Sequence, residues 1–227
     1  MTGPDPDEHA RRLAAESLAV DDPTGWFERL YAEAETGETV VPWDRGEPHR
    51  LLVEWAEAGE LEGGGRRALV VGCGPGHDAA YVAGLGFDTV AFDVAATAVE
   101  VARRRYPDSG VRFHTADLLN PPAAWREAFD LVVESHTVQA LPGSPRPEAI
   151  ANVAHLVAPG GTLIVIAAAR DEDDDPEEGP PWPLTRAEID SFTSGGLRAV
   201  RIEDVRDAVN PSVHRWRAEF HRPRPGR

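Results

Sequence analysis

The chain of 227 residues is long enough for one sizeable hydrophobic core, and 39 acidic against 23 basic residues give a formal net charge of −16. A surface this acidic repels phosphate backbones and anionic membranes, so we expect neither a nucleic-acid nor a membrane partner. The basic residues counted here are all arginines, which excludes lysine Schiff-base chemistry, and the single Cys73 excludes an internal disulfide and a thiolate-rich zinc site. No residue pattern indicates a metal site, and the longest apolar runs are too short to span a bilayer, so we expect a cytoplasmic protein.

The N-terminal quarter has helical patterns separated by an irregular stretch. Residues 6–20 have helical spacing, and Asp22-Pro23 predicts the start of a second helix with an apolar face that includes Trp26. Prolines and glycine keep residues 40–50 out of regular structure, and a short amphipathic helix then runs to Gly59. We expect two parts in the chain, a helical cap segment at 1–60 and a main domain at 61–227.

From Ala68 onward, short apolar runs alternate with helical patterns, which is typical of parallel strands covered on both faces. The predicted strands are 68–71, 89–93, 111–114, 131–134 and 162–168. The predicted helices are 77–83, 97–105, 122–128 and 146–156, the last ending at Pro-Gly-Gly.

The C-terminal part changes pattern. Residues 184–192 predict a helix with a capping box between Thr185 and Glu188, and two strand-like runs at 197–206 and 213–221 follow without a helix between them. These runs predict an antiparallel hairpin, so the fold class is α/β, a Rossmann-like doubly wound sheet of seven strands that is otherwise parallel. The acidic run at 171–178 reads as a solvated surface loop, with a lid as the alternative.

A glycine turn follows the first strand of the main domain. In open sheets of this kind ligands bind beyond the carboxyl ends of the strands, and glycines at 72, 74 and 76 allow backbone N–H groups to approach a ligand closely. Asp93 ends the second strand, where a carboxylate accepts hydrogen bonds from both ribose hydroxyls. These features predict a site for a ligand that contains adenosine.

The spacing of the glycines indicates which ligand this is. A dinucleotide fingerprint reads G-x-G-x-x-G, whereas this turn reads G-x-G-x-G, which disfavours a nicotinamide oxidoreductase. The turn resembles the first motif of class I S-adenosylmethionine-dependent methyltransferases. The similarity continues through AFD ending at Asp93, TADLL around Asp117, FDLVVES at 129–135 and LVAPGGTLIVI at 156–166.

Two upstream segments resemble a narrower group. WFERLY at 26–31 and PWDRGEPHR at 42–50 are similar to the thiopurine, thiol and halide methyltransferases, in which such a segment covers the cofactor. Val70 departs from the acidic residue usual in the broad class. The resemblance implies S-adenosylmethionine as cofactor, bound by a set of residues from the motifs and the cap: Gly72, Cys73, Gly74, Gly76, Asp93, Val94, Asp117, Leu118, Glu134, Ser135, Trp26 and Trp43.

Methyl transfer from a sulfonium requires mainly positioning in a closed, partly dry pocket. Candidates for its walls are Trp26, Tyr31, Trp43 and Trp182. His136 and Glu134 are the candidate acid–base residues at the end of the fourth strand, with structural hydrogen bonding as the alternative for each, and Arg45 is a candidate partner for a carboxylate.

The predicted function is methyl transfer to a heteroatom of a small molecule, with sulfur favoured because a thiol needs less activation than an alcohol. Two alternatives stay open: an O- or N-methyltransferase of a natural product, and a cofactor-binding protein that transfers nothing. The sequence does not indicate an oligomeric state.

Overall fold

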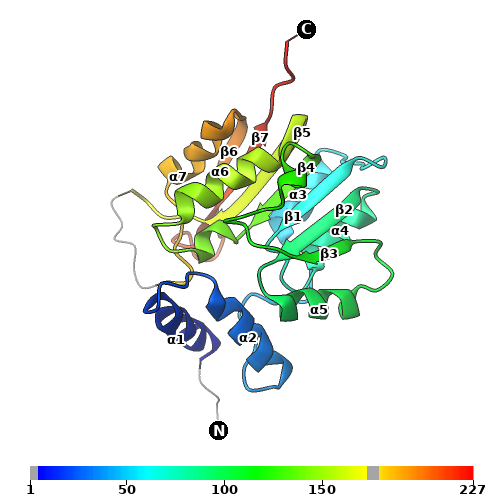
Figure 1. The fold of residues 1–227 in the computed structure, drawn as a ribbon. Helices are drawn as coiled ribbons and strands as arrows, with labels where there is room; N and C mark the ends of the chain where they lie inside the picture. Colours follow the sequence, from blue (N-terminus) through cyan, green and yellow to red (C-terminus); the bar gives the residue numbers. More distant parts are fainter. Residues whose placement is uncertain (1–4, 173–178, 227) are drawn as a thin grey trace.

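The computed structural model describes residues 5–172 and 179–226 and shows a seven-stranded sheet with helices on both faces (Figure 1). The sheet order is β3-β2-β1-β4-β5-β7-β6; the first five strands are parallel, and β7 runs antiparallel to both β5 and β6. The strands are β1 Arg67–Val71, β2 Asp88–Asp93, β3 Arg112–Thr115, β4 Phe129–Ser135, β5 Val157–Ala168, β6 Arg198–Arg206 and β7 His214–His221. The predicted fold class, including the C-terminal hairpin, is confirmed.

The helices fall into three groups. The N-terminal helices are α1 Pro6–Leu18, α2 Gly25–Glu35 and α3 Arg50–Ala58. The helices between strands are α4 His77–Gly84, α5 Ala96–Arg105, α6 Arg146–Leu156 and α7 Arg186–Asp190. The described residues also contain three short 3-10 turns: η1 Ala123–Trp125, η2 Val138–Ala140 and η3 Ser191–Gly195.

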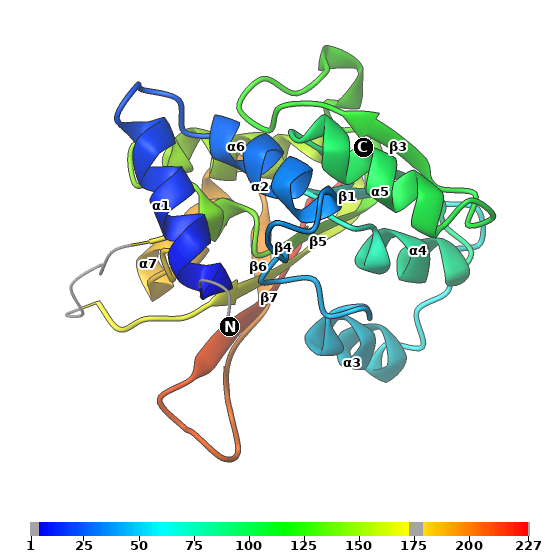
Figure 2. The ribbon, with the colours of Figure 1, turned by 90° about the horizontal axis from the view of Figure 1, so that it is seen from below.

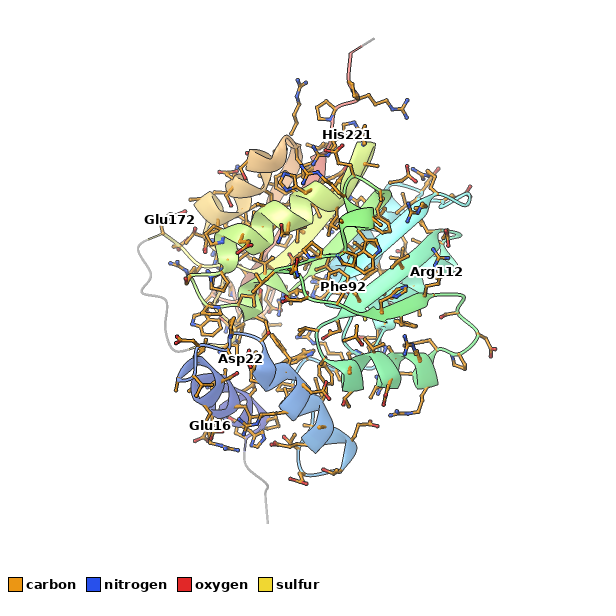
Figure 3. The ribbon with its side chains drawn as sticks, in the orientation of Figure 1. Glu16, Asp22, Phe92, Arg112, Glu172 and His221 are labelled. Carbon is orange, nitrogen blue, oxygen red and sulfur yellow. The ribbon has the colours of Figure 1, made fainter. Side chains whose placement is uncertain are left out.

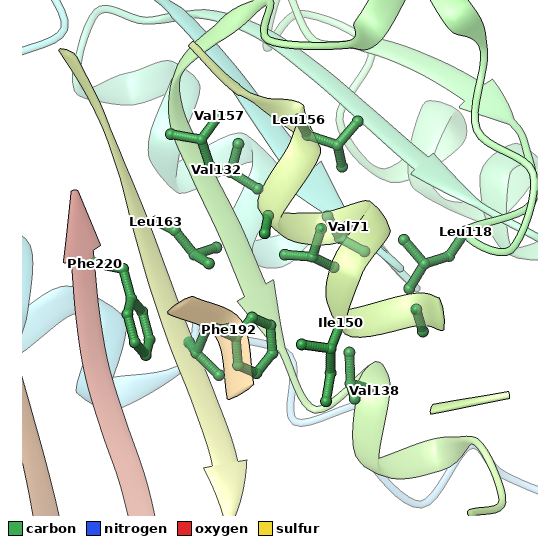
Figure 4. Packing of buried hydrophobic residues seen from close by; sticks show 14 of the residues in the cluster. Val71, Leu118, Val132, Val138, Ile150, Leu156, Val157, Leu163, Phe192 and Phe220 are labelled. Carbon is green, nitrogen blue, oxygen red and sulfur yellow. The ribbon is translucent and has the colours of Figure 1, made fainter. Parts of the chain in front are cut away.

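Alternate residues of each central strand enter two separate cores. Leu69 and Val71 of β1 pack toward α6 and η3, in the cluster that Figure 4 shows around Ile150 and Phe192. Val70, one residue along, faces the other core, formed with α3, α4 and α5. Because both faces are covered, the strands are apolar throughout, and burial of each large aliphatic side chain contributes about 1.5–3 kcal/mol.

The strand order reverses at β1, which pairs with β2 on one side and with β4 on the other. At such a switch point the connections leave to opposite faces and open a crevice beyond the carboxyl ends of the strands. Figure 2 views the molecule from this end, with α1 and α2 lying across the sheet. The N-terminal helices therefore lie over the part of the sheet where the sequence predicts a ligand.

Two predictions are wrong: the helix expected at 122–128, in the connection after β3, and the turn expected at 159–161, before β5. Residues 122–128 form only the 3-10 turn η1, because Glu127 has a positive φ of 50° and its N–H donates to the carbonyl of His155. The Pro-Gly-Gly sequence lies within β5: Gly160 N–H donates to the carbonyl of Arg222, and Arg222 N–H donates to that of Gly161. Pairing with the chain after β7 thus continues the strand where a turn was expected.

Helix starts and ends differ slightly elsewhere. The second helix begins at Gly25, because the Asp22 carboxylate accepts hydrogen bonds from Thr24 N and Gly25 N. The predicted capping box at Thr185 is confirmed, but α7 ends at Asp190 and continues as η3. No helix within residues 5–172 and 179–226 is both long and apolar enough to cross a membrane. Most of the acidic run, 173–178, lies outside the described residues.

Candidate functional site

A cavity of about 380 Å³ lies at the carboxyl ends of β1, β2 and β4. Its wall includes most of the residues that the sequence assigned to the cofactor: Gly72, Cys73, Gly74, Asp93, Val94, Asp117, Leu118, Ser135, Trp26 and Trp43. His136 and Arg45 also line it. The tertiary structure therefore brings together segments that are more than one hundred residues apart in sequence.

The glycine turn has a backbone that larger residues do not fit. Gly72 has φ of 56°, and a Cβ there would lie 2.2 Å from Thr137 Oγ1. Gly74 has φ of 48°, and its Cβ would lie 2.8 Å from the Tyr31 hydroxyl. Gly76 is not among the lining residues; a Cβ there would meet Ala102 of α5 at 2.9 Å, so it allows α4 to begin close to α5. That Gly76 contacts a ligand stays a prediction.

Asp93 is 7 % exposed and joins the glycine turn to the end of β2. One carboxylate oxygen accepts from Gly74 N (2.9 Å) and the other from Ala95 N (2.9 Å). Burial raises the pKa of Asp93 to about 6 against the opposing effect of these backbone donors. Each oxygen of a carboxylate has a further acceptor site, so Asp93 can also accept from two hydroxyls of a ligand in the cavity.

Asp117 and Leu118 form the wall beyond β3. The Asp117 carboxylate accepts from Leu119 N at 2.8 Å, which orders the turn. Leu118 lines the cavity and also packs in the core, as Figure 4 shows. A flat apolar wall beside a carboxylate can accept the face and the amino edge of an adenine ring.

Aromatic residues of the cap form the opposite wall. Trp43 Nε1–H donates to the Tyr31 hydroxyl at 2.9 Å, and the rings of Trp26 and Trp43 meet edge to face with centroids 6.0 Å apart. Trp26 is 1 % exposed and Trp43 is 39 % exposed. Trp182 is not among the lining residues; Pro180 and Pro181 line the cavity in that segment.

Residues 41–49, here called the strap, connect α2 to α3 across the glycine turn. Asp44 of the strap binds both His77 of α4, with Oδ1 at 2.8 Å from Nε2, and Arg105 of α5, with Oδ2 at 2.9 Å from Nη1. Burial raises the pKa of Asp44, but the bonds from His77 and Arg105 outweigh it and leave this pKa below its usual value. A charged Asp44 thus holds the strap against the main domain.

Two histidines meet on the side of the cavity away from β2. His49 Nε2 and His136 Nε2 are 3.1 Å apart, and His49 Nδ1 accepts from Leu51 N at 3.2 Å. Because a backbone N–H always donates, the proton of neutral His49 is on Nε2 and points at His136. Burial lowers the pKa of His49 to about 3 and that of His136 to about 4, with Arg215 and Arg45 lowering both further. Both rings are therefore neutral near pH 7.

Glu134 lies behind the cavity wall and is not among the lining residues. Its Oε1 accepts from Thr137 N (2.8 Å) and Val138 N (2.9 Å), so it orders the turn that carries His136. Burial raises the pKa of Glu134 to about 7, and Oε2 has no hydrogen-bond partner within the described residues. The geometry gives Glu134 a positioning role, and direct contact with a ligand stays a prediction.

Among the lining residues that sequence reasoning missed are His49, Asp78 and Arg215. The partly buried Asp78 carboxylate accepts from His49 N at 2.7 Å and fixes the end of the strap, and desolvation raises its pKa. Asp78 lies in the first turn of α4, directly after the glycine turn, and this position could have indicated from the sequence that it lines the cavity. Arg215 lies in β7 and has no local signal, because strand pairing alone brings it to the cavity.

Comparisons with known proteins indicate the family of this chain. A family model described as a methyltransferase domain matches residues 68–161. A probable thiol methyltransferase 2 from Arabidopsis thaliana is 28 % identical over 92 % of this chain and 97 % of its own. Thiocyanate methyltransferase 1 from Brassica oleracea is 30 % identical over 73 % of this chain and 72 % of its own. The N-methyltransferase NodS from Bradyrhizobium japonicum, solved with S-adenosyl-L-homocysteine, shares the fold with a TM-score of 0.64 at 22 % identity, covering 80 % of this chain and 92 % of that one.

Proposed function

Since the chain belongs to the class I S-adenosylmethionine-dependent methyltransferases and resembles their thiol methyltransferases, we propose that it transfers the methyl group of S-adenosylmethionine to the sulfur of a small molecule. The observation that carries this proposal is the pairing of the glycine turn with Asp93 at one end of the cavity. The relatives named as thiol and thiocyanate methyltransferases support sulfur as the attacking atom.

The residues present fit the cofactor. The turn at Gly72 and Gly74 leaves no Cβ between the backbone and a ligand, and Asp93 offers acceptor sites for the two ribose hydroxyls. When bound, the cofactor supplies an electrophilic methyl group on a sulfonium sulfur. The aromatic rings of Trp26, Tyr31 and Trp43 exclude water and place π-electron density near a cation in the cavity.

The side of the cavity at His49 and His136, where we place the methyl acceptor, offers only weak bases. The Nε2 lone pair of His136 receives the proton of His49, and a pKa near 4 makes this imidazole a poor acceptor for the proton of a thiol. His136 therefore orients the acceptor in our proposal. Catalysis rests on holding a nucleophile in line with the methyl group, which alone gives a large entropic advantage.

The remaining parts of the proposal concern partners and the cap. A cavity of about 380 Å³ suits a cofactor with a small acceptor, and a net charge of −16 opposes nucleic-acid and anionic membrane surfaces. We propose residues 1–60 as a cap over the main domain at 61–227, supported by the ion pairs of Asp44 with α4 and α5.

The test is a methyl-transfer assay with labelled cofactor against thiols, catechols and amines, combined with calorimetry of S-adenosyl-L-homocysteine binding. We expect binding and labelled thioether products. Labelled catechols or amines with no labelled thiol would support the oxygen or nitrogen alternative. Binding without any product from the whole panel would support a protein that binds the cofactor and transfers nothing.

A further inference from the structure

A residue of the N-terminal cap completes a helix of the main domain. Helix α5 begins after Ala95, and the methyl side chain of this residue cannot accept the N–H groups that an N-cap oxygen usually binds. Glu28 of α2 takes that place: its Oε2 accepts from Thr97 N at 3.1 Å and its Oε1 from the Thr97 hydroxyl at 2.5 Å. A carboxylate is favoured there, because the N-terminal end of a helix is electropositive. The start of α5 is therefore capped by a residue 69 positions earlier in the chain.

The two helices lie along each other beyond this contact. Arg104 in the last turn of α5 pairs with Glu35 at the end of α2, and these residues are also 69 positions apart. Helices α2 and α5 therefore run parallel, side by side, for about two turns (Figures 1 and 2). Tyr31 of α2 packs on Ala98 of α5 between the two polar contacts. The pair at Arg104 is exposed and contributes little, whereas the contact of Glu28 is partly buried.

The contact of Glu28 lies between two parts of the cofactor site. Asp93 accepts from Ala95 N at 2.9 Å, so Asp93 and Glu28 bind neighbouring N–H groups at the same helix start. Burial raises the pKa of Asp93, and the nearby charge of Glu28 adds to this rise. On the side of the cap, Phe27 and Tyr31 of α2 line the cavity. Glu28 thus lies where the cap, the start of α5 and the cavity meet.

We propose that Glu28 is a positioning residue for the cofactor: its contact with Thr97 docks α2 on α5 and so holds the aromatic wall of the cap over the glycine turn. This rests on the proposed binding of S-adenosylmethionine. A ligand that contacts both the cap and the main domain binds fully only when α2 is docked. By linkage, the bound cofactor strengthens the docking of α2 by the same factor by which docking strengthens cofactor binding.

Two substitutions remove the contact from opposite sides. Glu28→Ala removes the acceptor on the cap and should weaken binding of S-adenosyl-L-homocysteine about tenfold, mainly through faster dissociation. Thr97→Val removes the hydroxyl donor on α5, keeps the shape of the side chain, and should weaken binding about threefold. Because both changes act on one contact, the double variant should bind no more weakly than Glu28→Ala alone. Calorimetry gives the affinities, and competition in a stopped-flow instrument gives the dissociation rates.

A conservative variant and a matched control separate this contact from a general effect of charge. In Glu28→Gln the amide oxygen still accepts from Thr97 N and the NH₂ group can donate to the Thr97 hydroxyl oxygen, so most of the affinity should return. The control is Glu16→Gln in α1, labelled in Figure 3, because Glu16 pairs with Arg12 and Arg29 of the cap itself. This control should leave the affinity unchanged. A loss in Glu16→Gln equal to that in Glu28→Ala would overturn the proposal.

Docking is measured separately, without ligand, by amide hydrogen exchange. In Glu28→Ala the amides of α2 and of the first turn of α5 should exchange about tenfold faster than in the wild type. Addition of S-adenosyl-L-homocysteine should slow this exchange, because the ligand binds the docked form more tightly. Exchange at the wild-type rate in Glu28→Ala would mean that α2 stays docked without this contact, which would overturn the proposal.

Two further outcomes distinguish the proposed role from its alternatives. Lower thermal stability of Glu28→Ala and Thr97→Val with unchanged affinity and dissociation rate would overturn the proposal, because Glu28 would then cap α5 without positioning the cofactor. No binding of S-adenosyl-L-homocysteine by the wild type would overturn the proposed function. Faster exchange in the unliganded variant would still support docking of the cap through Glu28 in that case.

Discussion

Asp93 shows how one residue links the fold to ligand affinity. Its carboxylate is bound by two backbone N–H groups, yet burial holds its pKa near 6. A protonated Asp93 loses part of its capacity to accept hydrogen bonds from ribose hydroxyls. Cofactor affinity should therefore depend on pH in a range where few other carboxylates titrate.

We expect the affinity for S-adenosyl-L-homocysteine to be about tenfold weaker at pH 5 than at pH 7, as Asp93 takes up its proton. Asp93→Ala should weaken binding more than tenfold at pH 7, through loss of a charge-assisted pair of hydrogen bonds. Asp93→Asn should remove the pH dependence. Calorimetry at several pH values measures all three, and a wild-type affinity that is flat from pH 5 to 7 would contradict this assignment.

Glu134 should make stability depend on pH. Burial raises its pKa to about 7 from a usual 4.5, so the folded protein holds this proton more tightly than the unfolded chain. Its stabilising contribution is complete below pH 4.5 and is lost as the pH rises through about 7. The loss is on the order of 3 kcal/mol, and Asp93 acts in the same direction at lower pH.

Glu134→Gln should flatten the decline in the free energy of unfolding between pH 5 and 8, measured with urea. The amide oxygen keeps the two bonds to Thr137 N and Val138 N. Glu134→Ala is the contrasting variant and should lose about 1–3 kcal/mol at pH 5, because two buried N–H groups lose their acceptor. Parallel pH curves for wild type and Glu134→Gln would disprove the role given to this proton.

At the scale of elements, the cap and the glycine turn are fitted to each other. Gly74 has no Cβ where the Tyr31 hydroxyl of α2 approaches, and Trp43 of the strap donates to that hydroxyl. The cap and the glycine turn, which are separate segments of the sequence, thus pack against each other at Gly74. The fit is a packing requirement and therefore open to a double-mutant test.

Gly74→Ala should weaken binding of S-adenosyl-L-homocysteine at least tenfold, because the Cβ meets Tyr31 and the left-handed backbone disfavours alanine. Adding Tyr31→Phe removes the oxygen in contact and should restore part of the loss, leaving the backbone cost. The coupling between the two changes, measured by calorimetry on all four proteins, should be about 1 kcal/mol or more. Strictly additive losses would mean that the cap does not press on the turn.

At the scale of the whole molecule, ligand binding should stabilise the folded chain. A ligand at one hundred times its dissociation constant adds about 2.7 kcal/mol, which for a chain of this length raises Tm by about 5–11 °C. We expect this shift with S-adenosylmethionine and S-adenosyl-L-homocysteine and none with nicotinamide dinucleotides. A thermal-shift titration measures it, and a shift with NAD alone would contradict the reading of the glycine spacing.

Much of the architecture followed from local patterns in the sequence. The five parallel strands, the C-terminal hairpin and the capping box at Thr185 were predicted because apolar runs, helical periodicity and caps act over a few residues. Residues 122–128 and the Pro-Gly-Gly at 159–161 were misjudged, because backbone hydrogen bonds to the His155 carbonyl and with the backbone of Arg222 decide their conformation. These hydrogen-bond partners lie far away in the sequence, so a local pattern does not indicate them.

The sequence by itself determined the sheet, the glycine turn and the carboxylate at the end of β2, since each depends on neighbours along the chain. Only the tertiary structure decided that His49 meets His136, that Glu134 is behind the wall, and that Arg45 and Arg215 face one cavity. These residues come from the strap, from β4 and the turn after it, and from β7. Burial sets the pKa of Glu134, and burial together with charges far away in sequence sets the pKa of His49 and of His136. Burial and long-range pairing exist only once the chain has folded, so the meeting of these residues in one cavity could not be predicted from the sequence, although His136 and Arg45 were candidates individually.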